Sequence, residues 1–245
     1  MTEERKQEAA EMGWLSRIGG VLFSPGKTFS YIASKPDWLI PLVVIIIFSL
    51  ISVVMITSRV DMGAVVRERL EPRLERGEIS EEDFERAVEV STKIGKYAPY
   101  GGVILFFPLM LLVISGVFHF IFTLQTGEST FRKVFSVTTY SFMPSVISSI
   151  ITTLLLLSRP VGSVSSPEGL VRSSAAAFLD PQTTSKFLYN LASSVEFFSI
   201  WILALLVFGY SAAINQSKKK TAVVVIALWL IFIIGKAAIA CWILR

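Results

Sequence analysis

The ionisable side chains inside the long apolar stretches of this 245-residue sequence are the first candidates for chemistry, because burying such groups in lipid is costly. His119 and Tyr140 lie in two neighbouring stretches, each a similar number of residues from the same membrane face. A helix rises about 1.5 Å per residue, so the two side chains lie at similar depth. We predict a hydrogen bond between them. Proton transfer or ligand binding, and snorkelling to the interface, are the alternatives.

Glu196 and Lys236 form a second candidate pair. Glu196 begins the fourth apolar stretch, and Lys236 lies near the end of the fifth. The topology inferred below puts both on the external side of the membrane, so we predict an ion pair. The alternatives are snorkelling of Lys236 to the interface and, for the pair, a part in transport.

Pro144 lies in the middle of the third stretch, which also carries hydroxyl side chains along one helical stripe: Ser141, Ser145, Ser148, Ser149 and Thr152. Small hydroxyl residues let helices approach closely and offset the backbone hydrogen bond that a proline removes. The pattern predicts that this helix lies at the centre of the bundle. A water-lined path along the stripe is the alternative.

Other kinds of site have no support in the sequence. There is one His and one Cys, too few for a zinc module or a disulfide framework, and no GxGxxG or GxxxxGK phosphate-binding motif. No group of residues offers a nucleophile, a base and an orienting partner together. We therefore predict neither a cofactor nor a metal site, and no enzyme. The net charge of +4 comes from basic residues that flank apolar stretches, which indicates no nucleic-acid partner.

Five long apolar stretches must position these side chains. Hydrophobic residues make up 53% of the sequence and charged residues only 17%. A bilayer core about 30 Å thick needs roughly 20 residues of helix. Because each stretch is continuous rather than alternating, helices are favoured over strands. The prediction is an all-α polytopic transmembrane bundle of five helices, over residues 38–57, 99–124, 135–157, 195–214 and 221–244.

Two amphipathic regions flank the first stretch. Residues 1–36 form an N-terminal segment in which Trp14, Leu15 and Ile18 repeat at helical spacing and Ser24-Pro25 starts a second short helix. We expect these helices to lie in the membrane interface as an anchor, with partner binding or curvature sensing as the alternative.

The pattern of residues 59–98 predicts an external helical hairpin. Its first helix covers Met62–Arg76, and its second helix starts after Ser80, which caps it. Its mixed charges indicate a solvated face, and a docking surface is the alternative.

The basic residues set the orientation. The two shortest loops contain Arg132-Lys133 and Lys218 to Lys220, and they lie on the same side as the basic N-terminal segment. Cytoplasmic loops carry an excess of Lys and Arg. We predict a cytoplasmic N-terminal segment (1–36), a five-span membrane domain (37–245) and an external C-terminus.

The sequence also resembles the Yip1 domain membrane proteins in their short prokaryotic form. The resemblance lies in the segments Val21–Leu42 and Pro99–Ile147, with Gly127, Phe131 and the Tyr140…Pro144 pair. It implies a five-span bundle with a cytoplasmic N-terminus in a prokaryotic cytoplasmic membrane. Eukaryotic members act in vesicle traffic with Rab GTPases, through an N-terminal region with an Asp-Leu-Tyr-Gly-Pro segment. This sequence contains no such segment, so the resemblance does not extend to a Rab partner.

Two functions follow from these features. The first is a non-enzymatic membrane-organising or trafficking-type adaptor that binds membrane lipids and membrane-protein or peripheral partners. The second is a small transporter or lipid-handling protein with a polar path near His119, Tyr140 and the third stretch. A continuous polar cavity that reaches His119 would favour the transporter, and a core packed with Phe and Leu would favour the adaptor. The sequence is compatible with a homo-oligomer.

Overall fold

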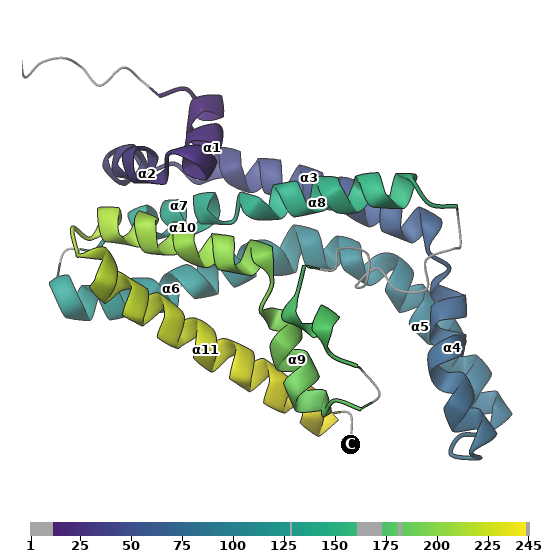
Figure 1. The fold of residues 1–245 in the computed structure, drawn as a ribbon. Coiled ribbons are helices and arrows are strands. Elements are labelled where there is room, and N and C mark those ends of the chain that lie inside the picture. Colours follow the sequence, from purple (N-terminus) through teal and green to yellow (C-terminus); the bar gives the residue numbers. More distant parts are fainter. Residues whose placement is uncertain (1–11, 128, 161–172, 181–182, 244–245) are drawn as a thin grey trace, which may run out of the picture. The chain divides into compact units, whose positions relative to one another are not determined.

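The computed structural model describes residues 12–127, 129–160, 173–180 and 183–243 (Figure 1). The all-α class is confirmed for these residues, since their secondary structure is helical apart from one isolated bridge between Ser174 and Glu196. The chain divides into two compact units. Unit 1 comprises Met1–Val43, Leu111–Ser145 and Ser173–Arg245, and unit 2 comprises Val44–Met110 and Val146–Arg172.

The helices are, in chain order, α1 (Trp14–Phe23), α2 (Pro25–Ser34), α3 (Leu39–Arg59), α4 (Met62–Glu75), α5 (Glu81–Gly101), the π-helical turn η2 (Gly102–Phe106), α6 (Phe107–Thr126), α7 (Phe131–Ser141), α8 (Pro144–Leu157), the 3-10 turn η4 (Ala175–Phe178), α9 (Lys186–Ser194), α10 (Phe197–Ala213) and α11 (Lys218–Ile243).

Four helical segments in the described part of the chain are long and apolar enough to cross a membrane: Leu39–Arg59, Glu81–Thr126, Phe131–Leu157 and Lys218–Trp242. The first, second, third and fifth predicted stretches fall largely within them. The remaining stretch, 195–214, contains α10, which has only 17 residues. At about 1.5 Å per residue α10 is slightly shorter than a hydrocarbon core of about 30 Å. Glu196 precedes the helix, and Asn215, in a left-handed conformation, follows it.

The third stretch, predicted as one helix with Pro144 in its middle, is divided into α7 and α8. Pro144 begins α8 and does not lie inside one continuous helix. A proline has no N–H to donate four residues back, and the Tyr140 carbonyl accepts a 3.1 Å hydrogen bond from the Met143 amide instead. The predicted stripe is therefore divided between two helices. Ser141 and Ser145 donate to carbonyls of their own segment, at Val137 and Phe142.

Within unit 2, helices α4 and α5 pack on each other and are joined through Gly77, whose φ of +69° suits a glycine. The predicted helix start at Ser80 is confirmed, because its hydroxyl accepts the Asp83 amide at 3.1 Å. Arg67 binds both carboxylate oxygens of Glu85, at 2.7 and 3.0 Å. Phe84 is buried. Acids and bases on these helices therefore largely balance one another.

Hydroxyl groups also connect the apolar helices of unit 2. Ser52 on α3 donates to the Ser149 carbonyl on α8 at 2.9 Å and lies 3.0 Å from the Thr153 hydroxyl. Thr57 and Tyr100 form a hydroxyl pair at 3.0 Å. Such bonds satisfy polar groups that lipid cannot solvate.

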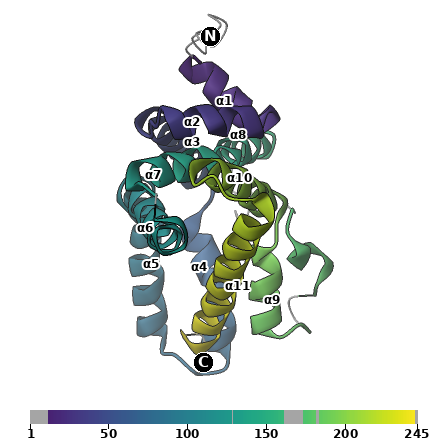
Figure 2. The ribbon, with the colours of Figure 1, turned by 90° about the vertical axis from the view of Figure 1, so that its left-hand side faces the viewer.

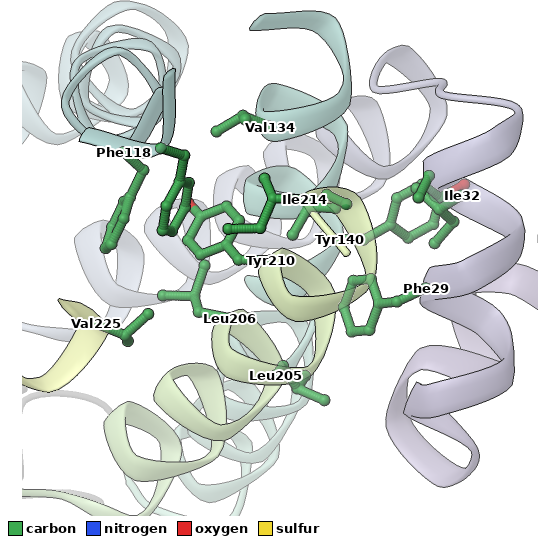
Figure 3. Close-up of a cluster of buried hydrophobic side chains, with 14 of the residues drawn as sticks. Phe29, Ile32, Phe118, Val134, Tyr140, Leu205, Leu206, Tyr210, Ile214 and Val225 are labelled. Atoms are coloured by element: carbon green, nitrogen blue, oxygen red, sulfur yellow. The ribbon is translucent and has the colours of Figure 1, made fainter. Parts of the chain in front are cut away.

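Unit 1 is built around α10, which contacts α2, α7 and α11, while α1 packs on α2 (Figure 2). The core of this unit combines aromatic and aliphatic side chains (Figure 3). The Tyr210 ring lies 4.6 Å from the Phe118 ring and 5.1 Å from the Phe122 ring, centroid to centroid. Phe29 on α2 is fully buried in the same cluster. The core between these helices is therefore filled by side chains.

Gly209 permits the close approach of α10 to α7 and α2. A Cβ atom added there would overlap the Val137 side chain and lie 2.9 Å from two ring carbons of Phe29. Overpacking of this kind costs about 1–3 kcal/mol. We expect Gly209→Ala to lower the stability of the detergent-solubilised protein by that amount, measured as loss of helical circular dichroism on unfolding.

Gly116→Ala is the matched control. Gly116 also lies in an apolar helix of unit 1, and nothing lies within 4 Å of the position where its Cβ would be. We expect this variant to unfold at the same midpoint as the natural chain or slightly above it. Equal losses in the two variants would mean that the close approach at Gly209 has no specific role.

Candidate functional site

A polar cluster in unit 1 joins Arg17, Asp37 and Tyr140. Arg17 Nη1 lies 2.8 Å from Asp37 Oδ2, and the Tyr140 hydroxyl donates to Asp37 Oδ1 at 3.0 Å. One carboxylate thus binds a cation on α1 and a hydroxyl on α7. The cluster fixes the N-terminal helices to the apolar helices of the same unit.

The local sequence explains why Asp37 reaches both partners. The Ser24 amide bonds to the Gly20 carbonyl at 2.7 Å, which ends α1, and Pro25 occupies the first position of α2. Phe29 and Ile32 then bury one face of α2. These constraints fix the direction of α2, so Asp37, in the short link between α2 and α3, lies close to α1 and α7.

The cluster is largely removed from solvent. Tyr140 is fully buried, and the side chains of Arg17 and Asp37 retain 16% and 28% of their exposure. The Arg17 guanidinium also lies 5.9 Å from the centre of the Tyr31 ring. Removing one member of a desolvated ion pair is costly, because the other charge then remains without compensation. We therefore expect a variant that breaks this pair to release α1 from its position.

The predicted hydrogen bond between His119 and Tyr140 is wrong. His119 Nδ1 lies 3.0 Å from the Ser129 hydroxyl and 3.4 Å from that of Thr123, and its ring meets Phe131 edge-on. His119 thus fastens α6 to the turn before α7. Depth along the two helices was estimated from residue counts, but depth does not determine the direction in which a side chain points. Tyr140 faces Asp37 instead.

The predicted ion pair between Glu196 and Lys236 is also wrong. Glu196 accepts hydrogen bonds from Ser173 at 3.4 Å and Ser199 at 3.2 Å, and its backbone pairs with Ser174. Lys236 is exposed on α11 and makes no ion pair within the described residues. Glu196 therefore secures the start of α10 against the segment that begins at Ser173.

A chain of hydroxyls crosses the interior of unit 1. Thr138 on α7 lies 2.8 Å from the Tyr210 hydroxyl on α10, accepts from Ser115 on α6 at 2.8 Å, and donates to the Val134 carbonyl at 2.8 Å. Each hydroxyl has a partner inside the protein. Around it, Phe118 and Phe122 exclude water. The polar groups of this core are thus used to join helices.

Among the described side chains, no group of three or more His, Cys, Asp or Glu residues lies close enough together to hold a metal ion. Asp37, which sequence reasoning missed, is a carboxylate immediately before an apolar stretch. It lies within the Val21–Leu42 segment that carries the resemblance. Its position at the membrane edge was the signal that could have identified it.

Comparison with models of known protein families shows the family of this chain. The model of the Yip1 domain matches residues 19–239, nearly the whole length. This protein belongs to the Yip1 domain family. Its family membership and the four helical segments long and apolar enough to cross a membrane show that it is an integral membrane protein. No curated protein and no solved structure gives a significant match to the chain.

We expect Asp37→Asn to loosen α1 and α2 in this Yip1-family protein, because Arg17 would lose its compensating charge. Tyr140→Phe should have a smaller effect, of about 1.5–3 kcal/mol for a hydrogen bond to a charged group. Amide hydrogen exchange over residues 14–34, measured by mass spectrometry in detergent, should rise in the order natural chain, Tyr140→Phe, Asp37→Asn.

Glu85→Gln is the control. It also removes a carboxylate that pairs with an arginine, but both partners are at least half exposed. Exposed pairs contribute about 0–1 kcal/mol. Exchange over residues 14–34 should be unchanged in this variant. Unchanged exchange in Asp37→Asn as well would show that the cluster does not hold the N-terminal helices.

Proposed function

We propose that this Yip1-family protein is a non-enzymatic adaptor that organises membrane-protein or peripheral partners at the membrane. In this proposal, residues 1–36 are a cytoplasmic segment and residues 37–245 are a membrane domain that crosses the bilayer five times, with α10 as the short fourth span. The C-terminus lies outside, in a prokaryotic cytoplasmic membrane. The charge of the short loops supports this orientation.

The observation that carries the proposal is the filled interior of unit 1. Aromatic side chains occupy the space between α2, α6, α7 and α10, and the Thr138 and Tyr210 hydroxyls bond to each other. His119 is bonded to Ser129 beside the α6–α7 turn. A transporter needs polar groups that are free to bind a substrate in turn. Here those groups join one helix to the next, which favours a rigid scaffold.

The surface of the N-terminal helices supports an adaptor as well. The Arg17–Asp37–Tyr140 cluster holds α1 in place, while Leu15 and Phe23 on α1 are 66% and 84% exposed. Large apolar side chains on an amphipathic helix bury in the membrane interface or in a partner. A fixed helix with an exposed apolar face can present the same surface to every partner.

The orientation can be tested with single cysteines. In a Cys241→Ser background, Glu78→Cys places a thiol at the turn between α4 and α5, and Ser217→Cys places one before α11; both positions are exposed. A membrane-impermeant maleimide should label Glu78→Cys in intact cells and Ser217→Cys only after permeabilisation. The reverse pattern would overturn the proposed orientation, and equal labelling would contradict a membrane between the two sites.

The adaptor role predicts a partner at fixed stoichiometry. Crosslinking in native membranes, followed by purification of the tagged full chain, should recover one such partner. Recovery should fall in Asp37→Asn but not in Glu85→Gln, because only the former releases α1. Both variants are first checked for equal expression and monodispersity. Substrate-dependent flux in liposomes that hold only the pure protein would reject the adaptor in favour of a transporter.

A further inference from the structure

Five basic side chains gather at one end of unit 1. Arg132 and Lys133 lie in the first turn of α7, and Lys218, Lys219 and Lys220 lie in the first turn of α11. We call this group the basic end. All of its members are exposed except Lys133, which is half-buried.

Two tight turns bring these residues to the same end. Gly127, with φ of +71°, lies between α6 and α7, and Asn215, with φ of +51°, lies between α10 and α11. Gln216, which follows α10, donates to Gln125 in the last turn of α6 at 3.3 Å, so the ends of these two helices lie together. Figure 2 looks onto this end, where the starts of α7 and α11 flank the ends of α6 and α10. The two basic groups thus lie at the same end of unit 1.

Among the described residues, no acidic side chain pairs with this charge. In the described part of the chain, Arg132, Lys133, Lys219 and Lys220 make no ion pair, and the first turns of α7 and α11 contain no acid. The sequence of the two turns contributes a single acidic residue, Glu128. On α4 and α5, by contrast, arginines and lysines pair with glutamates. The excess positive charge is therefore available to attract an anion from outside the protein.

The surroundings indicate an anion with an apolar tail. Leu124 and Val223, close to the two turns in sequence, are 73% and 69% exposed on helices that are apolar enough to cross a membrane. Lys218 Nζ lies 4.2 Å above the Phe208 ring, so its stem covers apolar surface while its charge stays at the edge. In a membrane, acyl chains cover Leu124 and Val223, and the lipid headgroups lie at the level of the basic end. A phospholipid matches both halves of the surface.

We infer that the basic end binds the phosphate headgroups of anionic phospholipids, whose acyl chains lie along Leu124 and Val223. Basic clusters at the ends of membrane helices attract anionic headgroups by about 1 kcal/mol for each Lys or Arg near the surface, or about fivefold in association. The inference depends on the membrane location of the chain and not on the adaptor role. It adds a preference for one class of lipid.

The test uses the full-length protein in vesicles that contain a trace of spin-labelled lipid. Labelled phosphatidylglycerol should associate with the protein more strongly than labelled phosphatidylcholine. The double variant Arg132→Gln/Lys133→Gln should reduce this preference at least about fivefold. The separate triple variant Lys218→Gln/Lys219→Gln/Lys220→Gln removes three charges, so its preference should be lower than that of the double variant. High salt should also weaken it, because it screens exposed charges.

The matched control neutralises an equal number of cations elsewhere. Arg86→Gln/Lys93→Gln/Lys96→Gln removes three exposed basic residues of α5, two of which pair with nearby glutamates. The preference for phosphatidylglycerol should persist in this variant. An equal loss in it would assign the effect to net charge and overturn the inference.

Competition identifies the chemical class of the ligand. Inorganic phosphate or polyglutamate, added at millimolar concentration and constant ionic strength, should leave the preference unchanged. Displacement by inorganic phosphate would indicate a free-anion site, and displacement by polyglutamate would indicate an acidic protein segment. Either result, or equal association of the two labelled lipids with the natural chain, would reject a phospholipid site. Helical circular dichroism of each variant confirms folding before the measurement.

Discussion

The main constraint on this molecule is that polar groups among apolar helices must find partners inside the protein, since hydrocarbon offers none. Thr138 illustrates it: its hydroxyl takes part in bonds to groups on α6, α7 and α10. The same requirement places Tyr140 against Asp37 and gives Ser52 a carbonyl on α8. Apolar packing alone would leave these helices free to slide and rotate. The hydroxyl and carboxylate contacts specify one arrangement within each unit.

Sequence reasoning succeeded where one segment carried the whole signal. A continuous apolar stretch predicts a long helix by itself, and Ser80 with Asp83 predicts a helix start from four residues. The fold class and these helix boundaries follow from such local patterns. The family resemblance likewise rested on quoted segments, and the match over residues 19–239 confirms it. The apolar pattern does not reveal, by contrast, that α10 begins only after Glu196, whose side chain accepts a hydrogen bond from Ser173.

The side-chain pairings could not be predicted, because each depends on the rotation of two helices about their axes. His119 and Tyr140 were matched by depth, yet they point to different neighbours. Asp37 was overlooked because its importance comes from Arg17, which lies on another helix, and from the turn at Pro25 between them. A sequence gives the position of each polar group along its helix. The partner depends on packing that forms only in the folded chain.

The Arg17–Asp37 pair and the basic end differ in how their charge is compensated, and this difference bears on function. The charge of Arg17 is neutralised by Asp37 within the protein, so that contact can serve to position α1. Lys219 and Lys220 have no such partner in the described part of the chain, so their field extends outward. A scaffold needs both properties. Internal pairs keep α1 fixed, and unpaired external charge holds the basic end against an anionic leaflet of the membrane. Because the Arg17–Asp37 pair is largely removed from solvent and the basic end is exposed, salt should weaken the contact of the basic end with the membrane more than it weakens the pair.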